Sequence, residues 1–189
     1  MAIIAVFVGS VRRDRMGIRV ARWIERKLRA RNHSVFFIDP MELDLPLLDR
    51  MYKEMDNPSE KLKDLENKIK DAEGYVPVTP EYNRNTSSAL KNTLDYFLEE
   101  YYFKPSAIVS YSPGMFGGIN AAQQLRLIFA ELGAPSIPSS LAIPRVHKVI
   151  DENGILIDEA YDKRVDKLLD EFEWYIKALA NQRAQGTPY

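Results

Sequence analysis

The sequence contains no cysteine and only two histidines among its 189 residues. Without cysteine the chain can form no disulfide, no thiolate nucleophile, no iron–sulfur site and no c-type haem attachment. His33 and His147 lie far apart in the chain and do not suggest a zinc site, so we expect no bound metal.

Long apolar runs are also missing. No run approaches the ~20 residues that a membrane-spanning helix needs. The apolar opening, residues 2–8, lacks a basic start and ends in Gly-Ser rather than at a cleavage site, so it does not resemble a signal peptide. We therefore expect a soluble, cytoplasmic protein with no membrane partner.

An excess of charge of either sign is absent as well, because 26 lysines and arginines face 27 acidic residues. This balance argues against a dedicated nucleic-acid binder. Residues 12–31 do hold nine basic and two acidic side chains, but the helical ones lie opposite an apolar stripe of Val20, Ile24 and Leu28. The segment therefore predicts a solvated helix face, for which the acidic C-terminal helix offers partners within the chain or in another subunit.

The hydrophobic pattern alternates between strands and helices. Short apolar runs predict strands at residues 2–8, 34–38, 74–78, 107–111 and 135–143, although Pro77 disfavours a central strand and Pro138 disrupts the last one. Helical spacing predicts helices at 17–31, at 58–71, from about 86, after Gly118, and over a long stretch that ends near 182. This order predicts parallel βαβ units in a three-layer α/β sandwich, with residues 1–189 forming one domain.

Ligands of such folds bind at the carboxyl ends of the strands, which directs attention to the loops after the first, third and fourth strands. The first loop, residues 9–17, joins a buried strand to a helix start, where backbone N–H groups and the helix dipole attract an anion. Ser10, Arg12 and Arg15 add donors suited to a phosphate, whereas Arg13 is expected to point to water. The alternative is that these arginines are merely solvated. The loop carries neither a Walker A nor a Gly-x-Gly-x-x-Gly pattern, so a mononucleotide fits better than a dinucleotide.

A longer motif makes the interpretation more specific. Thr79-Pro-Glu-Tyr-Asn83 is followed by Ala89-Leu-Lys-Asn-Thr-Leu-Asp95, and later by Ser110-Tyr111, Gly117-Gly118 and Gln124-Leu-Arg126. Together with Gly9-Ser-Val-Arg12, these segments resemble the NAD(P)H-dependent FMN reductase family over almost the whole chain and in the same order. The resemblance implies a flavodoxin-like fold with a five-stranded parallel sheet in the order 2-1-3-4-5.

The resemblance also implies a non-covalently held FMN. Ser10, Arg12 and Arg15 would bind its phosphate with backbone help from Gly17 and Ile18. Pro80, Glu81, Tyr82 and Asn83 would line the isoalloxazine ring, and Ser112 and Gly114 would close the other side. The chain departs from the family pattern at Ser87-Ser88-Ala89 and in the bulkier loop 112–118, where Met115 and Phe116 cover the flavin or pack at a subunit contact.

The implied activity is hydride transfer from NADPH or NADH through FMN to a flavin, quinone or similar acceptor by a ping-pong mechanism. FMN carries this chemistry, so no catalytic acid or base is expected from the protein. Arg84, at the rim, is a candidate contact for the phosphates of the nicotinamide cofactor. Two other functions stay open: a flavodoxin-type electron carrier, and a flavin-free regulatory domain on the same scaffold. The resemblance further implies a homodimer or homotetramer.

Overall fold

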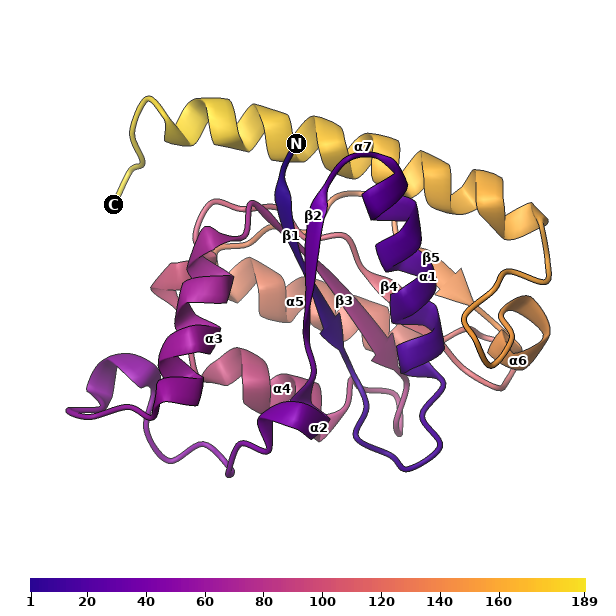
Figure 1. Cartoon of the computed structure of the whole chain (residues 1–189), viewed down its shortest axis with the longest axis horizontal. Helices are drawn as coiled ribbons and strands as arrows, with labels where there is room; N and C mark the ends of the chain where they lie inside the picture. Colours follow the sequence, from indigo (N-terminus) through magenta and orange to yellow (C-terminus); the bar gives the residue numbers. More distant parts are fainter.

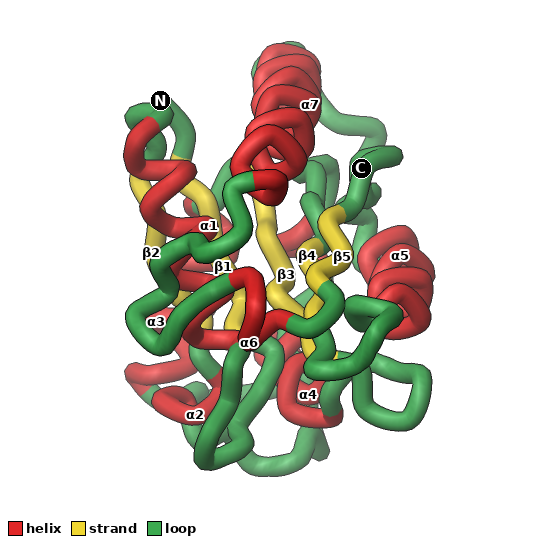
Figure 2. The backbone as a smooth tube through the Cα atoms, turned by 90° about the vertical axis from the view of Figure 1, so that its right-hand side faces the viewer, coloured by secondary structure: helices red, strands yellow, loops and turns green.

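The computed structural model describes residues 1–189. Its sheet has five parallel strands in the order β2-β1-β3-β4-β5, which confirms the predicted fold class and strand order; the labels in Figure 2 run across the picture in this sequence. The strands are β1 (Ile3–Val8), β2 (Ser34–Ile38), β3 (Gly74–Pro80), β4 (Val109–Tyr111) and β5 (Leu141–Ile143). The helices are α1 (Gly17–Ala30), α2 (Pro40–Leu43), α3 (Glu60–Asp71), α4 (Ser88–Asp95), α5 (Ile119–Glu131), α6 (Val146–Val149) and α7 (Ala160–Arg183), with short 3-10 turns η1 (Tyr52–Glu54) and η2 (Glu99–Tyr101).

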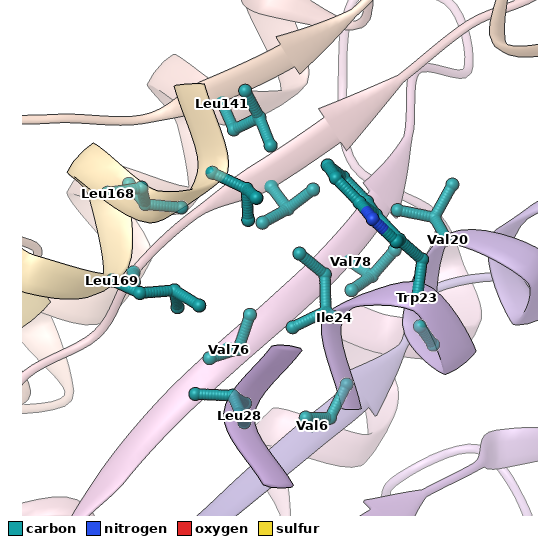
Figure 3. Close-up of a cluster of buried hydrophobic side chains, with 14 of the residues drawn as sticks. Val6, Val20, Trp23, Ile24, Leu28, Val76, Val78, Leu141, Leu168 and Leu169 are labelled. Carbon is teal, nitrogen blue, oxygen red and sulfur yellow. The ribbon is translucent and has the colours of Figure 1, made fainter. Parts of the chain in front are cut away.

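The sheet is buried on both faces, as the continuous apolar run of β1 predicts. Ile4, Val6 and Val8 belong to a core with α1 and α7, whereas Ala5 and Phe7 belong to a second core with α3, α4 and α5. Successive side chains of a strand point to opposite faces, so one apolar strand can supply both cores. Figure 3 shows the first core, where side chains of α1 and α7 converge on those of β1 and β3.

Pro77 lies in the central strand, in spite of the prediction that it would disfavour that position. The main-chain groups of Tyr75 face the β4 side, since its N–H donates to the Pro105 carbonyl and its carbonyl accepts from the Ala107 N–H. Two residues on, Pro77 has no N–H for that side. The β3–β4 ladder is accordingly interrupted after Tyr75 and resumes at Val78. The proline is accommodated by a gap in the ladder, and β4 is shorter than the predicted 107–111.

The fifth strand is also shorter than the predicted 135–143. Ser136 makes an isolated bridge to Ser106, and β5 proper begins only at Leu141, beyond Pro138. The short helices α2 and α6 were not predicted, because elements of four residues leave no periodicity to recognise.

The basic side of α1 is partnered within the chain by acidic residues of α7. The Lys27 ammonium lies 2.9 Å from carboxylate oxygens of both Asp162 and Asp166, and the Arg31 guanidinium bonds Asp166, Asp170 and Glu173. These pairs bear out the expectation that the C-terminal helix would offer partners for this face. In Figures 1 and 2, α7 lies along the end of the molecule opposite α2 and α4, which leaves the carboxyl ends of the strands open to the loops.

No helix combines the length and the apolar character that crossing a membrane requires.

The cluster of charges between α1 and α7 predicts an acid-sensitive contribution to stability. Burial alone would raise the pKa of Asp166, but hydrogen bonds from Lys27 and Arg31 outweigh it and lower that pKa. Because the folded-state pKa lies below the unfolded value, the contribution is present above about pH 4 and is lost as the pH falls through the folded pKa. Asp166→Asn should therefore lower the free energy of unfolding at neutral pH by up to about 1 kcal/mol, since the side chain is partly exposed. It should also flatten the loss of stability between about pH 5 and pH 2.

Urea denaturation at a series of pH values measures both effects. Asp64→Asn, in an exposed pair with Lys68 within α3, is the matched control and should change the profile less. Identical acid profiles for the wild type and Asp166→Asn would contradict this account.

Candidate functional site at the carboxyl edge of the sheet

The loops after β1, β3 and β4 meet at the carboxyl edge of the sheet and enclose a cavity of about 380 Å³, here called the carboxyl-edge cavity. Its lining comprises Ser10, Arg12, Arg13, Asp14, Arg15, Met16, Pro80, Glu81, Tyr82, Tyr111 and Pro113. Its volume is within the range of small-molecule sites.

A second hollow, of about 340 Å³, lies on the other side of the first loop, between Val11, α2 and α4. Two polar side chains that line this second hollow, those of Asn92 and Thr93, already make hydrogen bonds within the protein. The Asn92 side chain bonds the main chain at Pro46 and Leu48, and the Thr93 hydroxyl donates to the Ala89 carbonyl. The carboxyl-edge cavity, by contrast, offers hydroxyls and guanidinium groups together and is the stronger candidate for a polar ligand.

The first loop begins with a close approach to the backbone of β3 that only glycine allows. The Gly9 N–H donates to the Val78 carbonyl at 2.8 Å, and a Cβ on Gly9 would lie 2.5 Å from that same oxygen. The chain therefore leaves β1 in close contact with β3, and Ser10 is buried beside it. The Ser10 hydroxyl lies 2.7 Å from the Tyr82 hydroxyl, which joins the first loop to the loop after β3.

The first residue before α1, Met16, lines the same cavity as Ser10 and Tyr82. No side chain caps the helix, and its first turn holds no acidic residue. A Cβ on Gly17 would lie 2.5 Å from the Tyr111 hydroxyl oxygen, so glycine is what lets that hydroxyl approach the helix end. Burial raises the pKa of Tyr111 well above its usual range, although hydrogen bonding with Ser10 and the Gly17 amide opposes the shift. The Tyr111 hydroxyl therefore stays protonated and can donate to an anion at the positive end of α1.

The two arginines expected at the phosphate differ in their partners. Arg15 forms a two-pronged ion pair with Asp39 at 2.5 and 2.6 Å, and it also donates to the Ser10 carbonyl at 2.9 Å. The Asp39 side chain is only 3% exposed and that of Arg15 12%. Arg12 has no carboxylate partner, and its guanidinium lies 5.8 Å from the centre of the Tyr82 ring. Arg12 is thus available to a ligand, whereas Arg15 ties the first loop to the end of β2.

The loop after β3 is a tight hairpin turn. The Thr79 and Thr86 hydroxyls, 2.8 Å apart and buried, hold its base, and Tyr82 and Asn85 exchange main-chain hydrogen bonds at 2.9 and 3.0 Å. The two residues between them, Asn83 and Arg84, have φ of 51° and 67°. Tyr82 consequently lines the cavity, while Asn83 lies exposed at the tip of the turn.

Glu81 was expected at the isoalloxazine ring, and the structure gives its carboxylate a further role. It accepts hydrogen bonds from the Asn120 N–H at 2.9 Å, from the Asn120 side-chain amide at 3.0 Å and from the Ala121 N–H at 3.4 Å. The carboxylate therefore caps the amino end of α5, which lacks a side-chain cap of its own.

The Ser112 side chain holds the loop after β4 together through two hydrogen bonds. Its hydroxyl donates to the Gly114 carbonyl and accepts from the Gly117 N–H, and Arg145 donates its N–H to the same Gly114 carbonyl. Gly117 has φ of 64°, and a Cβ there would lie 2.8 Å from Pro144 N. Ser112 and Gly114 are not in the lining of the cavity, where Pro113 between them is.

The structure thus brings Ser10, Arg12, Arg15, Pro80, Glu81 and Tyr82 together at the cavity and places Gly17 and Ile18 at the helix start beside it. Asp39 was not expected at the site, and Tyr111 was quoted within the Ser110-Tyr111 motif but given no role of its own. Asp39-Pro40 carried a signal, because an Asp before a Pro at the first helical position is a helix cap, but no local pattern indicated that Arg15 would be its partner.

Comparison with known proteins identifies the family and supports the fold. The sequence model of the family described as NADPH-dependent FMN reductase matches residues 2–148. A quinone reductase of Pseudomonas putida is 30% identical over 182 residues, which are 92% of this chain and 94% of that protein. The NAD(P)H-dependent FMN reductase ntnL of Nectria sp is 35% identical over 134 residues, and this chain spans 66% of it, just under two thirds. Among solved structures, the flavoenzyme NAD(P)H:(acceptor) oxidoreductase FerB of Paracoccus denitrificans superposes with a TM-score of 0.78 at 24% identity, over 94% of this chain and 98% of that one, which supports the fold.

The ion pair of Arg15 and Asp39 generates a stability prediction. Asp39→Asn keeps an oxygen to accept from the Met41 N–H but leaves the Arg15 charge without its partner. Breaking a buried pair from one side typically costs about 3 kcal/mol or more, so the free energy of unfolding should fall by roughly that amount. Urea denaturation measures it. The matched control is Asp44→Asn, an exposed carboxylate nearby with no ion-pair partner, which should change stability by less than about 0.5 kcal/mol. Equal effects of the two variants would contradict the assigned role.

Proposed function

The chain belongs to the NADPH-dependent FMN reductase family and is an NAD(P)H-dependent oxidoreductase, and we propose that its carboxyl-edge cavity holds the FMN and that quinones are among its acceptors. The observation that carries this proposal is the convergence of Ser10, Tyr111, Arg12 and the uncapped start of α1 on one cavity. Helix starts with free N–H groups, hydroxyls and an arginine form the donor set that a phosphate ester requires.

The residues fit FMN at the phosphate end. The Tyr111 hydroxyl remains protonated, the Ser10 hydroxyl is buried beside it, and Gly17 leaves no Cβ in the way. In the proposal, Ser10, Arg12 and the amides of Gly17 and Ile18 bind the phosphate directly. Arg15 contributes positive charge at short range and holds the loop in shape through Asp39.

The loops after β3 and β4 would bind the ring. Pro80, Tyr82 and the main chain of Glu81 border the cavity, and Asn83 lies next to them in the turn. Because three N–H donors at the start of α5 bind the Glu81 carboxylate, its negative charge is partly compensated beside the ring. Ser112 and Gly114 would act through the shape of their loop, which positions Pro113 in the lining.

Bound FMN supplies the chemistry, the transfer of a hydride equivalent from NAD(P)H to an electron-poor acceptor. The protein's residues would orient the ring, exclude water from one side and fix the approach of both substrates, an effect that can be worth ~7–11 kcal/mol in favourable cases. We expect donor and acceptor to use the same open side in turn, which is ping-pong kinetics.

The family match favours the reductase over the alternative of a flavodoxin-type electron carrier. We further propose that the chain works in the cytoplasm, where NAD(P)H is regenerated, and as a homodimer or homotetramer. The 70% exposure of Met115, in the loop after β4, supports an association there. Leu90 and Leu94 are buried within the chain, so α4 presents no apolar face formed by these two residues.

Two measurements test the function. Protein saturated with FMN should lose its flavin absorbance within seconds when NADPH is added without oxygen, and recover it when a quinone follows. A carrier would keep the oxidised spectrum after NADPH, and a flavin-free regulatory domain would take up no FMN at all.

The placement of the phosphate gives a separate prediction. Ser10→Ala removes one hydrogen bond to a doubly charged group and should raise the Kd for FMN about tenfold. Fluorescence titration of FMN measures it, with Ser140→Ala as the control, because Ser140 is exposed on a loop before β5. An unchanged Kd for Ser10→Ala would place the phosphate elsewhere.

A further inference from the structure

A smaller hollow adjoins the carboxyl-edge cavity and shares Glu81 with it. It measures about 290 Å³ and is lined by Glu81, Arg84, Phe116, Ile119 and Asn120. It therefore lies between the turn after β3 and the start of α5, beside the place proposed for the flavin ring.

Of the two charged side chains that line this hollow, only the positive one, Arg84, has no hydrogen-bond partner. Its carboxylate, Glu81, is bound by the Asn120 side chain and by two N–H groups at the start of α5. Its guanidinium, Arg84, is exposed and makes no ion pair or side-chain hydrogen bond. Because Glu81 already compensates the positive end of α5, the attraction for an anion comes from Arg84 alone.

The backbone holds Arg84 in a fixed position. Its φ of 67° is a left-handed conformation that costs a residue with a Cβ about 1 kcal/mol or more. The main-chain hydrogen bonds between Tyr82 and Asn85 impose this conformation, and the buried Thr79–Thr86 contact holds the base of the turn. Arg84 is thus presented from a rigid turn rather than from a mobile loop.

The opposite wall is apolar and open to solvent. Phe116 is 78% exposed and Ile119 49% exposed. A phenyl face next to a free guanidinium matches a flat conjugated ring that carries an acidic substituent, with the ring against Phe116 and the anion at Arg84.

Building on the proposed function, we propose that Arg84 and Phe116 form an acceptor subsite that selects anionic aromatic acceptors, such as quinones bearing a sulfonate, a carboxylate or an ionised hydroxyl. Arg84 determines specificity by charge, and Phe116 supplies a surface for the ring. The rival role for Arg84 is contact with the phosphates of NAD(P)H, and the two roles affect different kinetic constants.

The test compares naphthoquinone with naphthoquinone sulfonate as acceptors of the FMN-loaded enzyme. Arg84→Asn is the variant, because asparagine tolerates the left-handed conformation and leaves the turn intact. We expect kcat/KM for the sulfonate to fall about tenfold relative to wild type, with kcat/KM for naphthoquinone and the KM for NADPH changed less than twofold. Comparing each acceptor with itself in wild type cancels the difference in their intrinsic reactivity.

Two further variants sharpen the test. Arg84→Lys should restore most of the activity toward the sulfonate, and Arg50→Ala, an exposed arginine without partners, should change neither acceptor. Added salt should lower kcat/KM for the sulfonate in wild type more than in Arg84→Asn.

Three outcomes would overturn the subsite: equal losses for both acceptors, no loss for either, or a rise in the KM for NADPH, which would assign Arg84 to the nicotinamide cofactor. Failure of the proposed function is a distinct result, since wild type would then neither bind FMN nor oxidise NADPH.

Discussion

The ion pair between Arg15 and Asp39 sets the geometry on which the site depends. It joins the loop after β1 to the end of β2, and through the Ser10 carbonyl it fixes the residue at the bottom of the carboxyl-edge cavity. Two charges that are both largely withdrawn from water are stable only when each satisfies the other, so the pair admits few arrangements of the loop. The neighbouring hydroxyls of Ser10 and Tyr82 extend this constraint to the loop after β3.

Around this pair, the polar groups of the site divide into those that build it and those left for a ligand. Glu81 caps α5, Ser112 closes its own loop, and Thr79 and Thr86 hold the hairpin turn. Arg12 and Arg84 form no ion pair, and no side chain of the N-cap residue caps the start of α1. Most of the side chains that build the loops are therefore bound to one another, so the site is shaped before any ligand arrives.

Much of this architecture could be predicted from the sequence, and the failures have physical causes. The apolar runs of β1 and β3 and the periodicity of α7 are local signals, and the motif around Pro80–Asn83 indicated which loops carry the site. Pro77 misled the prediction because the ladder, rather than the strand, gives way around it. The partners of Arg15 and Glu81 lie 24 and 39 residues away, and no local pattern encodes which carboxylate will meet which donor.

The ion pairs between the basic residues of α1 and the acidic residues of α7 have a consequence for the order in which the chain folds in the cell. The arginines and lysine of α1 emerge early in synthesis, whereas the carboxylates that neutralise them lie beyond residue 160. Until that helix is made, α1 covers only part of this side of the sheet, and its basic residues lack their acidic partners. During synthesis this layer of the fold therefore cannot be completed until the last helix has left the ribosome, and the apolar surface it will cover stays exposed until then.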